Sequence, residues 1–137
     1  MIDILLQHRT IRKYSDQPVD DHLLKLILEA GCRASTTGNM QVYSIVVTRD
    51  NAMKEKLAPL HFNQPMVKTA PVVLTFCADF NRFNQWCEAR QANPGYDNFL
   101  SFTTAAIDAL LVAQNVAVAA ESQGLGICYL GTTTYMA

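Results

Sequence analysis

The feature that most constrains the fold of this chain is a long, alanine-rich apolar stretch between residues 103 and 122. Its sequence, TTAAIDALLVAQNVAVAAES, predicts a helix, and Gly124 follows where glycine commonly ends one. A helix of about 20 residues is roughly 30 Å long. Because apolar residues occupy nearly all of its faces, interrupted only by Asp108, Gln114 and Asn115, we expect it at the centre of a domain or in a subunit interface.

The rest of the chain alternates between helix and strand patterns. Apolar periodicity and turn residues predict helices over residues 2–7, 20–33 and 50–60, and strands over residues 42–48, 71–79 and 127–131. The second strand, PVVLTFCAD, is almost continuously apolar, which is typical of a strand covered by helices on both faces. Residues 80–100 are polar and aromatic, and we expect them to form an excursion over a site.

These patterns predict one α+β domain spanning residues 1–137. We expect a three-layer α-β-α sandwich with a mixed sheet, in which the apolar helix at about 103–122 is central. Six residues, TTTYMA, follow the last predicted strand without a further helix or strand pattern. Because an α/β chain seldom stops directly after a core strand, we expect that the sequence is a fragment.

Composition and charge restrict the classes of function. The chain has 11 basic and 12 acidic residues, so its net charge does not favour nucleic acid or an anionic membrane. No uncharged apolar run reaches the length of a membrane span, and the N-terminus does not have the pattern of a signal peptide. The four cysteines show neither metal-ligand nor C-x-x-C spacing, which predicts no metal site and a reducing cytoplasmic compartment. Cys77 and Cys128 lie inside apolar runs, which predicts buried free thiols.

Two motifs could carry binding chemistry. In the first, His8-Arg9-Thr10-Ile11-Arg12, two arginines and a hydroxyl can converge on one anion, although a solvated basic turn has the same composition. The second, STTGNMQ at residues 35–41, offers small polar donors, but such residues also dominate ordinary helix-to-strand loops. A glycine-containing stretch at 124–131 follows a helix instead of opening one, so it is not a dinucleotide-binding fingerprint.

Taken together and in order, these segments resemble the nitroreductase family. The resemblance rests on HRTIRKYSDQPV, RASTTGNMQ, NQPMVKTAPVVLTFCADFNR and LLVAQNVAVAAESQGLGICYLG, and it extends from about residue 1 to 131. It is strongest to the oxygen-insensitive NADPH-dependent nitroreductase and flavin-reductase branch. Relatives continue beyond the position of Gly131 and supply a further basic pair for the cofactor phosphate and an arm that embraces the other subunit. The resemblance therefore implies that the usual C-terminal part is absent.

The resemblance implies that the cofactor is flavin mononucleotide (FMN). It places Arg9 and Thr10 at the phosphate with His8 beside them, and Arg12 near N1 and the C2 oxygen of the isoalloxazine. It also implies that Gln64 hydrogen-bonds the pyrimidine edge of the flavin. Because the flavin performs the redox chemistry, no catalytic residue is named.

Two further groups of residues follow from the same resemblance. Thr36, Thr37 and Asn39 match the family's S-S-G-N loop, which contacts FMN bound mainly by the partner subunit. The backbone groups of Leu130 and Gly131 would lie near N5 or the central edge of the ring. Threonines replace the commoner serines and keep the hydroxyls, whereas residue 35 is a serine where many relatives have proline.

The implied function is a homodimeric oxidoreductase with shared sites. It would transfer two electrons from NAD(P)H to a small nitroaromatic, quinone or flavin acceptor by a ping-pong mechanism. Two alternatives stay open: a reaction such as reductive dehalogenation on the same fold, and a non-catalytic flavin- or nucleotide-binding module.

Overall fold

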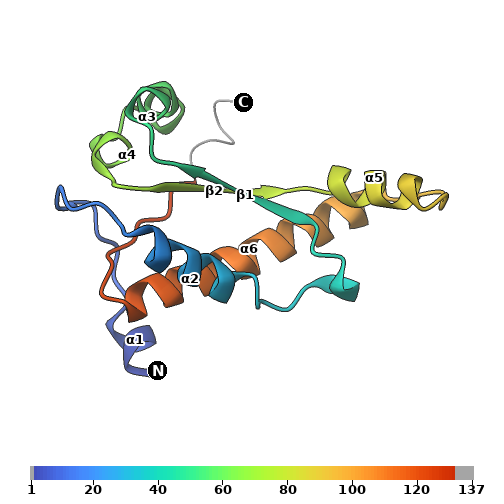
Figure 1. Ribbon diagram of the computed structural model, residues 1–137, viewed down its shortest axis with the longest axis horizontal. Coiled ribbons are helices and arrows are strands. Elements are labelled where there is room, and N and C mark those ends of the chain that lie inside the picture. Colours follow the sequence, from blue (N-terminus) through green and yellow to red (C-terminus); the bar gives the residue numbers. More distant parts are fainter. Residues whose placement is uncertain (1, 132–137) are drawn as a thin grey trace.

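The computed structural model describes residues 2–131, in which helices pack on a small two-stranded sheet (Figure 1). The helices are α1 (Ile2–Gln7), α2 (Asp21–Gly31), α3 (Asn51–Leu57), α4 (Pro65–Thr69), α5 (Asn81–Ala89) and α6 (Phe99–Ser122). The strands are β1 (Tyr43–Thr48) and β2 (Val73–Ala78), and two short 3-10 turns are η1 (Thr37–Asn39) and η2 (Ala58–His61).

The apolar helix is α6, as predicted, and it begins four residues earlier than expected. The Asn98 side chain caps its first turn by accepting the N–H of Ser101 at 3.0 Å. At the other end, Gly124 follows the helix with a φ of 78°, a left-handed conformation that favours glycine. The length of α6 and its mean hydropathy of 1.5 would also suit a membrane span, a property that core helices of soluble proteins share.

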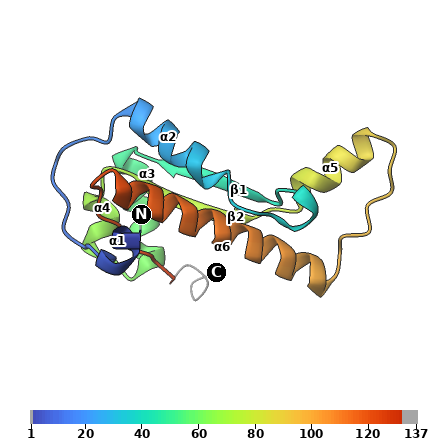
Figure 2. The ribbon, with the colours of Figure 1, turned by 90° about the horizontal axis from the view of Figure 1, so that it is seen from below.

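One face of the sheet packs against helices α2 and α6. β1 and β2 are antiparallel, with a register that runs from Tyr43↔Ala78 to Thr48↔Val73. Both α2 and α6 lie on the same side of the strands (Figures 1 and 2). The shared core is formed by side chains from both layers: Ile27, Tyr43, Ala109, Val112, Val116 and Ala120, with Ile45, Leu74 and Phe76 packed against them. The α+β class is therefore confirmed.

The expected third layer and mixed sheet are not present in residues 2–131. The sheet in this range has two strands and is antiparallel. Its other face is open at the middle, where Val46 of β1 is 51% exposed and its partner Thr75 of β2 is also exposed. β2 is therefore not fully covered on both sides, although its apolar sequence suggested that it would be. Residues 127–131 form no ladder, and the predicted strand there is wrong for this structure. An apolar sequence shows that burial is favourable, but a strand also needs a hydrogen-bonding partner along its edge.

Two short helices were not predicted. α4 lies between the predicted 50–60 helix and the predicted 71–79 strand, where no element was predicted, and α5 occupies the first half of the polar 80–100 segment. The α5 region is held together by aromatic contacts instead of an aliphatic stripe, with Phe80 and Tyr96 stacked at a centroid distance of 4.9 Å. All four cysteines are free, but Cys77 and Cys128, which were expected to be buried, are only half-buried, and Cys87 is the buried one. Residues 132–137, the basis for predicting a chain that stops after a core strand, lie outside the described range.

The contact between α2 and α6 leads to a first prediction. A Cβ added at Gly31 would lie 2.2 Å from Val116 Cγ2, well inside contact distance. We expect Gly31→Ala to lower the free energy of unfolding by about 1–3 kcal/mol, the usual cost of overpacking. Gly95→Ala is the matched control, because a Cβ there would meet nothing within 4 Å. Urea titration of the full encoded chain tests this, and equal stabilities for the two variants would contradict it.

Candidate functional site

The basic segment at residues 8–12 is held against the chain that follows α6. The N–H of Ile11 donates to the carbonyl of Ile127 at 2.8 Å. Gly126 permits this approach, because a Cβ there would lie 2.8 Å from the Cβ of Ile11. The segment therefore has a defined position beside the C-terminal end of α6 and is not a free basic tail.

The side chains of this segment differ in their partners. His8 Nδ1 lies 2.8 Å from Glu121 Oε1 on α6, which ties His8 to the helix. Arg9, Thr10 and Arg12 are exposed, and among residues 2–131 no carboxylate lies within ion-pair distance of either arginine. Two guanidinium groups and a hydroxyl are thus available to an anion.

The tyrosines near this segment have shifted acidities. Burial raises the pKa of Tyr14, the nearby Cys128 thiol raises it further, and the charge of Arg12 opposes the increase. Burial also raises the pKa of Tyr129, with a smaller contribution from Glu121. Both phenols therefore stay protonated at neutral pH and can act as hydrogen-bond donors, as Tyr129 does toward Gln114 Oε1 at 3.3 Å.

The loop that contains Thr36, Thr37 and Asn39 lies far from the basic segment along the molecule (Figures 1 and 2). The loop that carries them precedes the Tyr43 end of β1, next to α5, whereas residues 8–12 lie with α1 near the end of α6 (Figures 1 and 2). Both views place the two segments far apart along the long axis, with the basic segment near α1 and the loop near the start of α5. The structure therefore does not bring these two predicted groups together within one chain.

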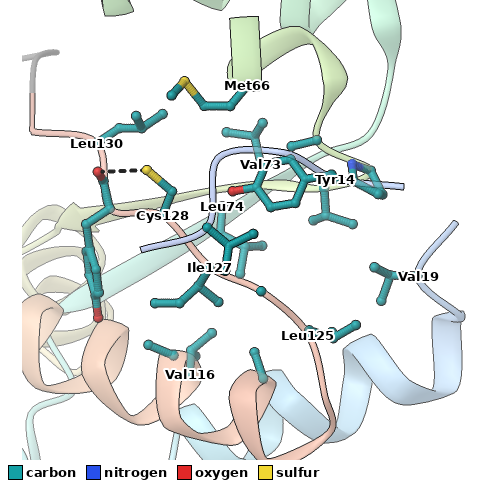
Figure 3. A pocket seen from close by; sticks show the side chains of 18 of the residues that line it. Tyr14, Val19, Met66, Val73, Leu74, Val116, Leu125, Ile127, Cys128 and Leu130 are labelled. Carbon is teal, nitrogen blue, oxygen red and sulfur yellow. Dashed lines mark hydrogen bonds between the residues drawn. The ribbon is translucent and has the colours of Figure 1, made fainter. Parts of the chain in front are cut away.

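The remaining predicted residues lie at the same end as the basic segment. Gln64 is half-buried and directly precedes α4. Leu130 is half-buried and lies across from Met66 of α4, as Figure 3 shows, and Gly131 is exposed. The same end of the folded molecule therefore contains the basic segment, Gln64 and the backbone of residues 130–131.

A cavity of about 640 Å³ opens at this end, between β2, α6 and the extended residues 124–130 (Figure 3). Its walls are mainly aliphatic, from residues such as Val73, Leu74, Val116 and Ile127. Of the predicted site residues only Leu130 lines it; Arg12 lies between two lining residues, Ile11 and Lys13. The cavity suits an apolar group with Lys13 at its wall, and Arg9 and Arg12 are not among its lining residues.

Sequence reasoning missed one residue that bears on this arrangement. Asp108 was noted only as an interruption in an apolar helix, yet it is fully buried and bonds to the 36–42 loop. The signal was present in the sequence, because a single acidic residue within an apolar helix needs a partner. Which partner it finds depends on the packing of α6 against the loop.

Comparison with known proteins gives consistent results. The model of the nitroreductase family matches residues 5–137. A curated Bacillus subtilis protein named FMN reductase (NADPH) is 38% identical over 132 residues, which is 95% of this chain and 53% of that protein. The chain thus spans about half the length of the curated relatives it matches.

Solved structures show the same fold relationship. A crystal structure from Bacteroides fragilis superposes with a TM-score of 0.95 at 61% identity, covering 97% of this chain and 54% of that one. The Vibrio harveyi NADPH:FMN oxidoreductase, solved with NAD⁺, superposes with a TM-score of 0.90 at 35% identity, covering 96% of this chain and 56% of that one.

Proposed function

This chain belongs to the nitroreductase family, and from that premise we propose that it is part or all of an FMN-dependent oxidoreductase. The reaction would be two-electron transfer from NAD(P)H to a small nitroaromatic, quinone or flavin acceptor. Relatives named NADPH-flavin oxidoreductase and oxygen-insensitive NADPH nitroreductase support this activity, at 37% identity each. Four free thiols are compatible with a reducing cytoplasmic location.

The observation that carries the proposal is the exposed donor set at residues 9–12. Planar guanidinium groups suit phosphate oxygens, and Arg9 and Arg12 have no carboxylate competing for them within the described range. Thr10 adds a hydroxyl beside them. The residues present therefore fit the phosphate and polar edge of FMN.

Each part of the chain would have a distinct task. Arg9 and Thr10 would bind the phosphate with His8 beside them, Arg12 would neutralise charge at the pyrimidine side of the ring, and Gln64 would hydrogen-bond the pyrimidine edge. The backbone of residues 130–131 would orient the ring. When bound, FMN supplies the electron transfer in both half-reactions, and the chain supplies binding, orientation and electrostatics.

We further propose that the functional unit is a homodimer with shared sites. The Thr36–Asn39 loop and the basic segment lie far apart along the long axis of one chain (Figures 1 and 2), so the loop would serve a flavin held by another copy. The first half of α6 also exposes large apolar side chains, among them Phe99 at 81%, Leu100 at 73% and Phe102 at 63%. Such a surface is typical of a site of association.

The direct test is flavin binding and turnover by the full encoded chain. We expect the purified protein to be yellow, to release FMN on heating, and to oxidise NADPH when a nitroaromatic is added, with the parallel initial-velocity lines of a ping-pong mechanism. Riboflavin, which lacks the phosphate, is the matched control and should bind more weakly. A colourless protein that FMN cannot saturate would refute the proposal. A yellow protein without turnover would favour the flavin-binding module.

A further inference from the structure

Asp108 is a buried carboxylate at the middle of α6. Its side chain is 0% exposed, and no cationic side chain lies within ion-pair distance of it in residues 2–131. An ionised group is costly to bury unless hydrogen bonds compensate for the lost water. The hydrogen-bond partners of Asp108 therefore indicate its role in α6.

Both bonds go to backbone amides of a single loop. Oδ1 accepts the N–H of Thr37 at 3.0 Å, and Oδ2 accepts the N–H of Val42 at 3.4 Å. These two donors stand at the start of η1 and immediately before β1. One carboxylate on the central helix thus holds the loop at both of its ends.

The loop needs such support because its backbone is unfavourable. Gly38, Asn39 and Gln41 have φ values of 57°, 55° and 54°, in the left-handed region. Two of the three are not glycine, and such residues persist in this region where surrounding contacts hold them. On its outer side the loop is contacted by Arg82 of α5, whose guanidinium donates to the Gln41 carbonyl.

We propose that Asp108 is a positioning residue that holds residues 37–42 in the shape that presents Thr36, Thr37 and Asn39 to FMN. This inference rests on the function proposed above. Asp108 acts through the backbone N–H groups of the loop, and it is fully buried, so its own side chain is not offered to a ligand at the surface. Removing it should therefore change the loop first and flavin affinity as a consequence.

Three variants of the full encoded chain separate this role from a general effect on packing. Asp108→Asn keeps the size of the side chain and one acceptor oxygen, whereas Asp108→Ala removes both acceptors. The matched control is Val112→Ala, one turn further along α6. Val112 is also 0% exposed, so its truncation leaves a cavity in the core but removes no hydrogen bond to the loop's amides. All three should lower the melting temperature.

Hydrogen–deuterium exchange of residues 35–42, followed by mass spectrometry, reads the loop without any cofactor. We expect exchange to be about tenfold faster in Asp108→Ala, intermediate in Asp108→Asn and unchanged in Val112→Ala, since one charge-assisted bond corresponds to at least that factor. Unchanged exchange in both Asp108 variants would overturn the proposal.

Titration with FMN then tests the second step. We expect the dissociation constant to rise about tenfold in Asp108→Ala and to stay near the wild-type value in Val112→Ala. Faster exchange with unchanged affinity would overturn the positioning role toward FMN. If the wild-type chain binds no FMN, the proposed function fails, and the exchange experiment still decides whether Asp108 holds the loop.

Discussion

Mixed dimers of two variants with weakened flavin sites should regain activity. One variant is Arg9→Ala, altered in the basic segment. The other carries Thr36→Val, Thr37→Val and Asn39→Gly, which removes the polar groups of the loop and keeps a residue that tolerates a positive φ at position 39. If each site combines the basic segment of one copy with the loop of the other, a mixed dimer has one site in which both are intact.

The size of the recovery follows from two-fold symmetry. Random association makes about half of the dimers mixed, and each mixed dimer has one intact site of two, so about a quarter of wild-type activity should return. Co-expression with two affinity tags isolates the mixed dimers, in which bound FMN and NADPH oxidation can both be measured and should reach about half of the wild-type values. Either variant alone should show little bound FMN and little NADPH oxidation.

A matched control places the same substitutions together on one chain of the dimer instead of dividing them between the two chains. When all four changes are placed on one chain and that chain is paired with wild type, a shared-site dimer has no intact site. If each site instead lies within a single chain, this second dimer keeps one intact site and the first dimer has none. Activity in the second arrangement and not in the first would refute the shared site.

Substitution of the two arginines should separate affinity from redox potential. Arg9→Ala should weaken FMN binding by about tenfold or more, since a charge-assisted hydrogen bond contributes about 1.5–3 kcal/mol. Riboflavin affinity should change little, because riboflavin lacks the phosphate. Arg12→Ala should mainly lower the reduction potential of the bound flavin, by about 30 mV for each 1.4 kcal/mol of lost stabilisation in a two-electron couple.

Calorimetry and potentiometry on the full encoded chain measure these two effects. Arg90→Ala serves as the control, because Arg90 lies over the ring of Trp86, away from the basic segment, and should change neither quantity. Equal potentials in wild type and Arg12→Ala would show that Arg12 does not act on the flavin ring. Equal FMN and riboflavin losses in Arg9→Ala would contradict a phosphate contact.

Local sequence signals were enough to predict most of the regular elements. Helix α2 follows from an apolar stripe and from Asp20, whose side chain accepts the N–H groups of His22 and Leu23. Helix α6 and its glycine terminus follow in the same way. These features depend on side-chain periodicity and on bonds between residues a few positions apart, so the sequence determines them without knowledge of the fold.

The tertiary structure decided the relations between distant segments. The apolar sequence of β2 could not show that only one face of the strand is packed against helices within residues 2–131. Burial depends on which elements pack against a strand. The composition of the Thr36–Asn39 loop and of the basic segment suggested binding at both places, but only the fold shows that they lie far apart along the long axis of one chain (Figure 1).

Asp108 shows the same division at a single residue. The sequence alone determined that an acidic residue interrupts an apolar helix, and it implied that a partner must exist. Only the packing of α6 decided that this partner is the backbone of a loop 71 positions away, at Thr37. Hydrogen bonds between residues so far apart in sequence form only where the fold brings donor and acceptor together. Local sequence patterns do not predict which distant residues meet.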